Sequence, residues 1–189
     1  PRIHAALSME SSNAVDNGPT EQIIDLTSGW SMFSTYINAD NMAMDAIVSE
    51  IVGQVIIAKN YLGSAYLPEF GFNGIGDVLI GQGYQIKTTE ATELIISGSY
   101  ATDEQFSVEL AAGWNMIGYT KNIPLGPADA FGKITNSFTN EYPIIIVKNV
   151  SGMFWAPESG VNLLGDLIPG MGYMIYMNEP FIGFTFSDE

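Results

Sequence analysis

Short stretches in which apolar and polar residues alternate predict β-strands along most of the chain, because successive side chains of a strand point to opposite faces. The alternating stretches lie at residues 23–26, 30–36, 84–87 and 92–97. Two further runs, Val55–Ala58 and Ile144–Val147, are apolar throughout. Continuous apolar runs of this length favour central strands that are covered on both faces.

Two short helices are expected between these strands. Asp40 suits the N-cap of a helix that runs to about Ile51. The apolar residues of this stretch recur three or four apart and therefore share one helical face: Met44, Ile47, Val48 and Ile51. In the second half of the chain Pro127 suits a first helical turn. The same spacing follows it at Ala130, Phe131 and Ile134.

An internal repeat organises the chain. Residues 56–86 align with residues 145–175 at a constant offset of 89, with 15 identities in 31 positions and no gap. Upstream, Leu26–Met32 aligns with Leu110–Met116 at an offset of 84. The sequence therefore predicts two copies of one module.

This pattern predicts an α+β fold that is mostly β, with two tandem, pseudo-equivalent lobes. Each lobe is expected to hold a small antiparallel or mixed sheet and one short helix. We expect an extended N-terminal arm over residues 1–22, a first lobe over 23–100 and a second lobe over 101–189.

Four glycines recur at equivalent positions of the repeat, Gly81 and Gly83 in the first copy and Gly170 and Gly172 in the second. A phosphate-binding loop needs a strand before its glycines and a helix after them. Here the glycines precede a predicted strand, so we interpret them as residues that bend the chain into that strand.

A lysine and an aspartate also recur, as Lys59 with Asp77 and as Lys148 with Asp166. The structural interpretation is a partly buried ion pair, or a lysine that ties down the carbonyls of the glycine-rich loop. The functional interpretation is a catalytic lysine with a lowered pKa, or an acid/base dyad. The duplication favours the structural role, because hydrolases rarely repeat an intact site within so short a chain.

Four large aromatic residues occupy repeated positions. Trp30 and Trp114 lie between a turn and an apolar strand and are expected in the core. Tyr66 and Trp155 are equivalent residues near a predicted hairpin. Their rings either pack inside the lobes or stack on sugar rings, so they are the candidate glycan contacts.

Composition excludes several classes of function. Six Lys and Arg against 21 Asp and Glu give a net charge of −15, which disfavours nucleic acid as a partner. Cysteine is absent and His4 is the only histidine, which leaves thiolate chemistry impossible and a histidine-based triad or zinc site a poor hypothesis. No apolar run is long enough for a membrane-spanning helix. We expect no cofactor, no metal and no catalytic residue.

The repeated blocks resemble a known type of module. They are Gly-Trp-x-Met (29–32 and 113–116), the strand ending in Lys-Asn (59–60 and 148–149), and the glycine-rich stretches that contain Gly-x-Gly-Tyr (74–87 and 163–176). Together they resemble a repeat of acidic surface and virion proteins of marine bacteria and their phages. The resemblance spans about residues 23–186 and implies structural roles such as decorations and fibres. The second copy departs from the first where Tyr176 replaces Lys87 and Pro169 replaces Ile80.

The sequence thus predicts a non-enzymatic structural protein on the outer surface of a particle, foremost a phage virion decoration or fibre component. Its expected partners are capsid or other surface proteins and further copies of itself, joined through apolar surface and the N-terminal arm. The alternative is a glycan-binding or adhesin module of a bacterial cell surface, with Tyr66 and Trp155 as contacts.

Overall fold

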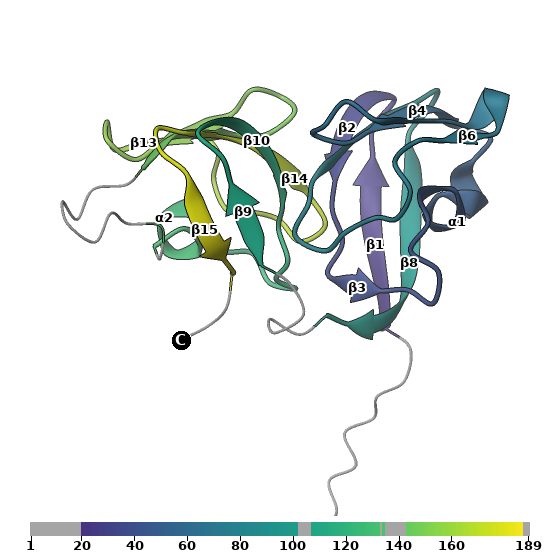
Figure 1. The fold of residues 1–189 in the computed structure, drawn as a ribbon, viewed down its shortest axis with the longest axis horizontal. Helices are drawn as coiled ribbons and strands as arrows, with labels where there is room; N and C mark the ends of the chain where they lie inside the picture. Colours follow the sequence, from purple (N-terminus) through teal and green to yellow (C-terminus); the bar gives the residue numbers. More distant parts are fainter. Residues whose placement is uncertain (1–19, 102–106, 133, 135–142, 187–189) are drawn as a thin grey trace, which may run out of the picture.

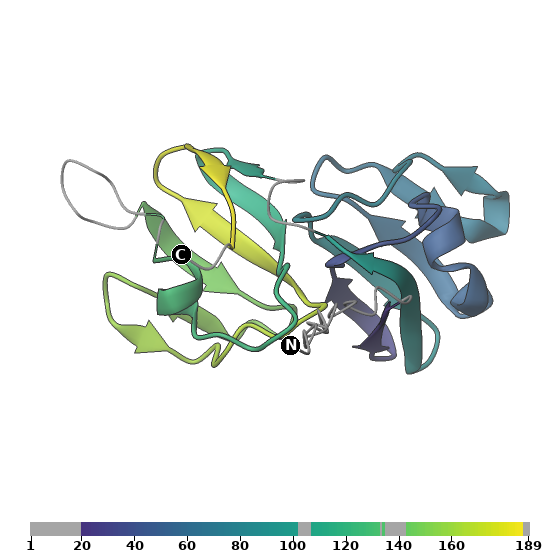
Figure 2. The ribbon, with the colours of Figure 1, turned by 90° about the horizontal axis from the view of Figure 1, so that it is seen from below.

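The computed structural model describes residues 20–101, 107–132, 134 and 143–186. Within these residues the chain is mostly β and forms two lobes that lie side by side (Figures 1 and 2). All strand pairs within the sheets are antiparallel, and each lobe has one short α-helix. The prediction of a mostly β fold with two similar lobes is therefore confirmed. The helices in the described part of the chain are too short to cross a bilayer.

Lobe 1 contains a five-stranded sheet of order β2-β7-β4-β5-β6 and a three-stranded sheet of order β1-β8-β3. Its strands are β1 (Thr20–Leu26), β2 (Gly29–Phe33), β3 (Ile37–Asn38), β4 (Val55–Lys59), β5 (Ala65–Leu67), β6 (Phe72–Asn73), β7 (Tyr84–Thr88) and β8 (Thr92–Tyr100). Its helices are α1 (Met44–Ile47) and the 3₁₀ turns η1 (Ser49–Ile51) and η2 (Pro68–Phe70).

Lobe 2 repeats this plan with a five-stranded sheet of order β10-β14-β11-β12-β13 and a two-stranded sheet of β15 and β9. Its strands are β9 (Val108–Leu110), β10 (Gly113–Gly118), β11 (Ile144–Lys148), β12 (Phe154–Ala156), β13 (Val161–Asn162), β14 (Gly172–Met177) and β15 (Phe181–Phe184). Its helix is α2 (Pro127–Ala130). The five strands of the second sheet thus correspond in order to the five strands of the first.

The core of each lobe lies between its two sheets. In lobe 1 the inward residues of β1 and β8, such as Ile24 and Leu94, share one apolar cluster with Phe33 and Ile86 of the five-stranded sheet. Lobe 2 has an equivalent cluster that includes Leu110, Phe184 and Ile175. Each five-stranded sheet therefore has one face on the core and one face turned outward.

The two lobes meet through a reciprocal pair of backbone contacts. Phe33 of β2 pairs with Met171 of lobe 2, and Ile117 of β10 pairs with Gln82 of lobe 1. Ile117 is the repeat equivalent of Phe33, and Met171 is the equivalent of Gln82. Each contact is therefore the image of the other, as in an isologous dimer interface with two-fold symmetry.

Hydrogen bonds at this junction follow the same symmetry. The Ser34 amide donates to the Gly170 carbonyl at 2.8 Å, and the equivalent Gly118 amide donates to the Gly81 carbonyl at 2.9 Å. The Ser34 hydroxyl adds a bond of 2.8 Å to the Met171 carbonyl. These bonds across the junction thus give hydrogen-bond partners to amide and carbonyl groups that have none within their own sheet.

Close backbone approach at the junction explains the recurring Gly-x-Gly motif. Gly81 and Gly170 have φ values of 84° and 83°, a conformation that favours glycine. A Cβ at Gly83 would lie 2.7 Å from the Ile117 carbonyl oxygen, and one at Gly172 would lie 3.0 Å from the Phe33 carbonyl oxygen. Gly81, Gly83 and Gly170 precede strands, and Gly172 is the first residue of β14. Gly83 and Gly172 also let the opposite lobe approach, a role that the sequence did not predict.

The helices are shorter than predicted, and Asp40 does not cap the first one. The helix α1 begins after Ala43, without a side-chain cap, and the Met44 amide donates to the Gly76 carbonyl at 2.9 Å. Ala43 also forms a β-bridge with Asp77, which holds this segment extended up to the first helical turn. In lobe 2 Pro127 occupies the predicted first turn, but α2 ends at Ala130.

Two further predictions need correction. The central strands β4 and β11 are covered on one face only, because each five-stranded sheet has one face on the core. In addition, Ile56 and Ile145 lie at register shifts and are exposed. Residues 20–22, predicted to end the arm, belong to β1, where Gln22 is buried. The rest of the predicted arm, residues 1–19, lies outside the described residues.

Substituting Gly118 with alanine is expected to lower the free energy of unfolding by about 1–3 kcal/mol, because the new methyl group overpacks the junction. A Cβ at this position would lie 2.4 Å from the Gln82 carbonyl oxygen and 2.6 Å from Ser34 Cβ. Gly53→Ala is the matched control, since a Cβ there meets no atom within 4 Å. Urea unfolding of both variants measures the difference, and equal midpoints would contradict the close approach.

Candidate binding face

The outward faces of the two five-stranded sheets carry the most distinctive side chains of the molecule. In lobe 1, cross-strand pairing places Trp30 opposite Lys87, and Lys59 opposite Gln85. Because directly paired residues share one face of a sheet, the register defines the open face of lobe 1. Its members are Trp30, Ile57, Lys59, Ala65, Leu67, Phe72, Gln85 and Lys87, whereas Met32 shares this register but is buried.

The same register defines the open face of lobe 2, which is richer in aromatic residues. Trp114 pairs with Tyr176, and the two rings meet edge to face with centroids 5.2 Å apart. The members of this face are Trp114, Ile146, Lys148, Phe154, Ala156, Val161, Met174 and Tyr176, whereas Met116 shares this register but is buried. Strands of both sheets lie along the upper side of the molecule in Figure 1.

The two tryptophans are not core residues, which corrects the prediction. Trp30 is 40 % exposed and Trp114 is 48 % exposed. The inward position next to each tryptophan is polar: Ser31 Oγ accepts from the Thr27 amide, and Asn115 Oδ1 accepts from the Ala111 amide. These bonds close the turn before each strand, and the alternation of the strand then turns the indole ring outward.

Lysine side chains cover both indole rings. The Lys59 ammonium lies 5.4 Å from the Trp30 ring centroid and the Lys87 ammonium 5.9 Å from it. In lobe 2 the Lys148 ammonium lies 4.6 Å from the Trp114 ring centroid. These distances allow cation–π attraction, which is worth about 0.5–1 kcal/mol at exposed sites. Three of the six Lys and Arg residues of the chain are thus gathered on the two open faces.

Acidic residues are kept off these sheets. The chain has 21 Asp and Glu residues, yet none lies in a strand that the structure assigns to either five-stranded sheet. By contrast, β1, β8 and β9 all contain carboxylates. The open faces are therefore locally cationic and apolar on a protein whose total charge is −15.

The predicted Lys–Asp ion pairs are wrong. Among the described residues no salt bridge joins Lys59 to Asp77 or Lys148 to Asp166, and both aspartates are exposed. The repeated lysines lie over tryptophan rings instead. The backbone of Asp77 forms the β-bridge with Ala43 that is described above.

The candidate glycan contacts from the sequence are buried. Tyr66 is 4 % exposed and Trp155 is 5 % exposed, and the Trp155 ring stacks on Phe131 with centroids 6.0 Å apart. Neither ring offers a face to a ligand, because both point into the core from the inward positions of β5 and β12. On the open faces the exposed aromatic residues are Trp30, Phe72, Trp114 and Tyr176.

The sequence prediction did not include Phe72 and Tyr176 among its candidate site residues. Phe72 pairs with Leu67 on the open face, and its ring covers Gly74, where a Cβ would lie 2.8 Å from the ring. The signal was available in the period-two alternation of each strand, once one residue of the strand is fixed as inward.

Other repeated polar side chains satisfy backbone groups. The Tyr84 hydroxyl accepts from the Leu79 amide at 2.8 Å, and the Tyr173 hydroxyl accepts from the Ile168 amide at 2.7 Å. Asn60 and Asn149 likewise accept amide hydrogens within their hairpin turns. The repeated tyrosines and asparagines are thus used to build the module.

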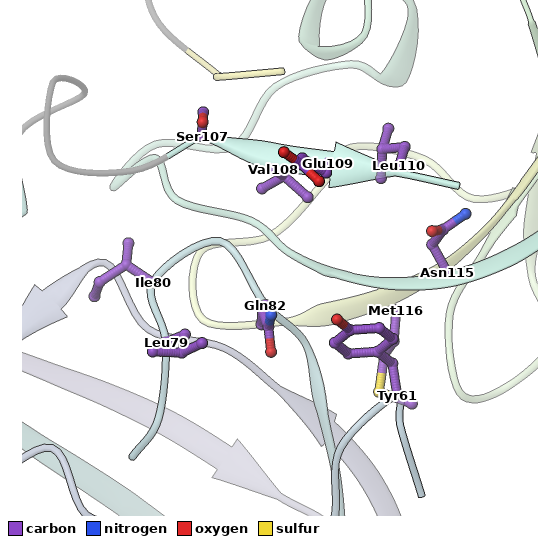
Figure 3. Close-up of a pocket in the computed structure, with 10 residues that line it drawn as sticks. All are labelled: Tyr61, Leu79, Ile80, Gln82, Ser107, Val108, Glu109, Leu110, Asn115 and Met116. Atoms are coloured by element: carbon purple, nitrogen blue, oxygen red, sulfur yellow. The ribbon is translucent and has the colours of Figure 1, made fainter. Parts of the chain in front are cut away.

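A small pocket of about 270 Å³ lies at the lobe junction (Figure 3). Residues around Leu79 and Gln82 face Ser107–Leu110 and β10 across it. Among the described residues that line it, Glu109 is the one carboxylate. Within the described residues no group of three or more acidic or histidine side chains is placed to hold a metal ion.

The alkaline limit of stability is expected to depend on Tyr173. Burial raises the pKa of Tyr173 to about 12, and the hydrogen bond from the Ile168 amide lowers it only in part. The folded state therefore holds this proton more tightly than the unfolded state, whose tyrosines have a pKa near 10.0. The resulting stability is complete below pH 10 and is lost as pH rises towards 12.

Unfolding by urea at several alkaline pH values, with tyrosinate absorbance as a second signal, measures this loss. In Tyr173→Phe the free energy of unfolding should fall less steeply with pH over the same range. An unchanged slope would contradict the assignment.

Comparisons with known proteins do not add to this description. No protein-family model matches the chain, and neither a curated protein nor a solved structure matches it. The candidate site therefore rests on the exposure, register and charge of the open faces.

Proposed function

We propose that this chain is a non-enzymatic structural protein of an outer surface, foremost a virion decoration or fibre component, which contacts its partners through its open faces. The observation that carries the proposal is the display of Trp30 and Trp114, with neighbouring aromatic residues, on the outward side of two sheets. Aromatic residues at such positions are typical of the centres of protein interfaces.

The use of the repeated residues supports a structural role. The glycines at the junction serve close packing, and the tyrosines and asparagines satisfy backbone amides. The lysines cover tryptophan rings on an open surface. Such an arrangement offers flat, rigid contact area to a partner, whereas catalysis needs converging groups in a recess.

The lobe 2 face gives the sharpest test of this proposal. We expect the purified chain to bind particles of its source that lack it, and Trp114→Ala with Tyr176→Ala to weaken that binding about tenfold or more, because a truncated aromatic anchor at an interface costs about 2 kcal/mol or more. Ile182→Ala is the matched control, since Ile182 is exposed but lies on β15, away from the open faces. Cosedimentation of chain and particles gives the affinities.

Absence of the chain from purified particles, or binding by the Trp114/Tyr176 variant that equals the binding of the unaltered chain, would refute the proposal. Binding that the Ile182 control weakens as much as the aromatic variant would place the contact elsewhere on the molecule.

A glycan-binding or adhesin module of a cell surface is the second candidate. The exposed Trp30 and Trp114 rings, each beside a lysine ammonium, favour it in place of the buried Tyr66 and Trp155. An aromatic face stacks on the C–H face of a sugar ring, and an ammonium pairs with an acidic substituent on that ring.

A glycan array separates the two candidates. The structural proposal expects no glycan whose binding depends on Trp114. If Trp114→Ala removes binding to a defined glycan while Ile182→Ala keeps it, the second candidate replaces the first.

A further inference from the structure

The outer face of β1 and β8 has the opposite character to the open face of lobe 1. Strand pairing sets Glu21 opposite Ser97, Ile23 opposite Ile95, and Asp25 opposite Glu93. All six side chains alternate with the buried residues of these strands. We name this surface the acidic face: three carboxylates around one pair of isoleucines.

The acidic face combines a repulsive pair of charges with exposed apolar surface. Like charges directly opposite each other in an antiparallel pair are destabilising, and Asp25 faces Glu93 in this way. Ile23 is 58 % exposed and Ile95 is 37 % exposed, so both side chains leave apolar surface open to solvent. Beside them Asp25 and Glu93 line a shallow depression of about 420 Å³. These features indicate a surface that is covered by something cationic and apolar.

The open face of lobe 1 has the complementary character. It presents two ammonium groups, Lys59 and Lys87, around the exposed ring of Trp30, with no carboxylate in its strands. The acidic face presents two adjacent carboxylates beside an apolar pair. Charge and apolar surface therefore match between two parts of the same chain.

One copy does not join these two faces within itself. The core of lobe 1 lies between the five-stranded sheet and the β1–β8 sheet, so their outward residues lie on different sides of the lobe. The two surfaces can meet only when they belong to different copies.

We propose that the open face of lobe 1 docks onto the acidic face of a second copy, with Lys59 and Lys87 against Asp25 and Glu93, and Trp30 against Ile23 and Ile95. Because the two contacting surfaces differ, the contact is heterologous and repeats from copy to copy, which generates rings or open filaments. The inference extends the proposed structural role by naming a second copy as the partner.

An acidic polymer is the less favourable occupant of the open face. It would meet the two ammonium groups of Lys59 and Lys87 but approach a molecule of net charge −15, whose field opposes it. A second copy brings the same total charge, yet its isoleucine pair also covers the Trp30 ring, and its own unfavourable Asp25–Glu93 pairing is relieved in the contact.

Charge reversal provides a decisive test in solution. The first variant carries Lys59→Glu and Lys87→Glu, and the second carries Asp25→Lys and Glu93→Lys. Each variant sets like charges against each other, so we expect the association constant to fall about tenfold or more. An equimolar mixture restores association, because the reversed open face of one variant then meets the reversed acidic face of the other.

Lobe 2 supplies matched controls at repeat-equivalent positions. Lys148 corresponds to Lys59 and Glu109 corresponds to Asp25. Lys148→Glu and Glu109→Lys are therefore expected to leave the association constant unchanged. Analytical ultracentrifugation near 0.15 M salt, where exposed charges act over about 8 Å, measures all variants, and circular dichroism confirms that each is folded.

The outcomes separate this inference from the proposed function. A wild-type chain that stays monomeric up to about 1 mM overturns the inference, since its binding free energy would then be weaker than about −4 kcal/mol. Variants that associate like the wild type, or a mixture that fails to recover, also overturn it. The inference is also overturned if an acidic glycan binds to Lys59 and Lys87 while the chain stays monomeric. None of these results depends on whether the chain is found on particles.

Discussion

The reciprocal backbone contact between the lobes is the constraint on which the rest of the structure depends. At this junction Phe33 and Ile117 each pair with the loop that precedes the last strand of the opposite five-stranded sheet. The approach is so close that a side chain at Gly83 or Gly118 would force the backbone to shift, and one at Gly172 would be tightly packed against Phe33. Because buried backbone groups need partners, these contacts fix how the lobes sit, with strands of both five-stranded sheets along the upper side of the molecule in Figure 1.

Much of the fold could be predicted from the sequence because the sequence of the module occurs twice in the chain. Identities such as Gly63/Gly152 and Tyr84/Tyr173 establish the equivalence of the strands from the residues alone. The predicted helices were too long, because the spacing of their apolar residues is also compatible with a longer helix. Tertiary contacts to Gly76 hold the residues before Met44 extended, and no local pattern encodes such a contact.

The candidate site was harder to predict, and the errors have one physical cause. Recurrence marks a residue as constrained but does not say from which side. Trp30 and Trp155 are both repeated-position aromatics, yet the first is outward and the second is buried. Whether a side chain points inward or outward depends on which residues of its strand face the core. For Trp30 and Trp114 the turn before the strand sets this, because Ser31 or Asn115 accepts a hydrogen bond there and occupies the inward position. The repeated lysines lie over the outward tryptophan rings and not beside the aspartates.

The fused, two-fold character of the junction has a consequence for how such a protein diversifies. In a symmetric dimer of identical chains every substitution appears on both sides of the axis at once, so its two binding surfaces must stay alike. Joining the two halves in one polypeptide removes that restriction while the shared glycines preserve the geometry. The exchange of Lys87 for Tyr176 is an example. In lobe 1 two lysine ammonium groups lie over the Trp30 ring, whereas in lobe 2 Trp114 packs against Tyr176 on the equivalent strands. Tandem duplication thus converts a symmetric architecture into one that holds two different surfaces in fixed mutual orientation.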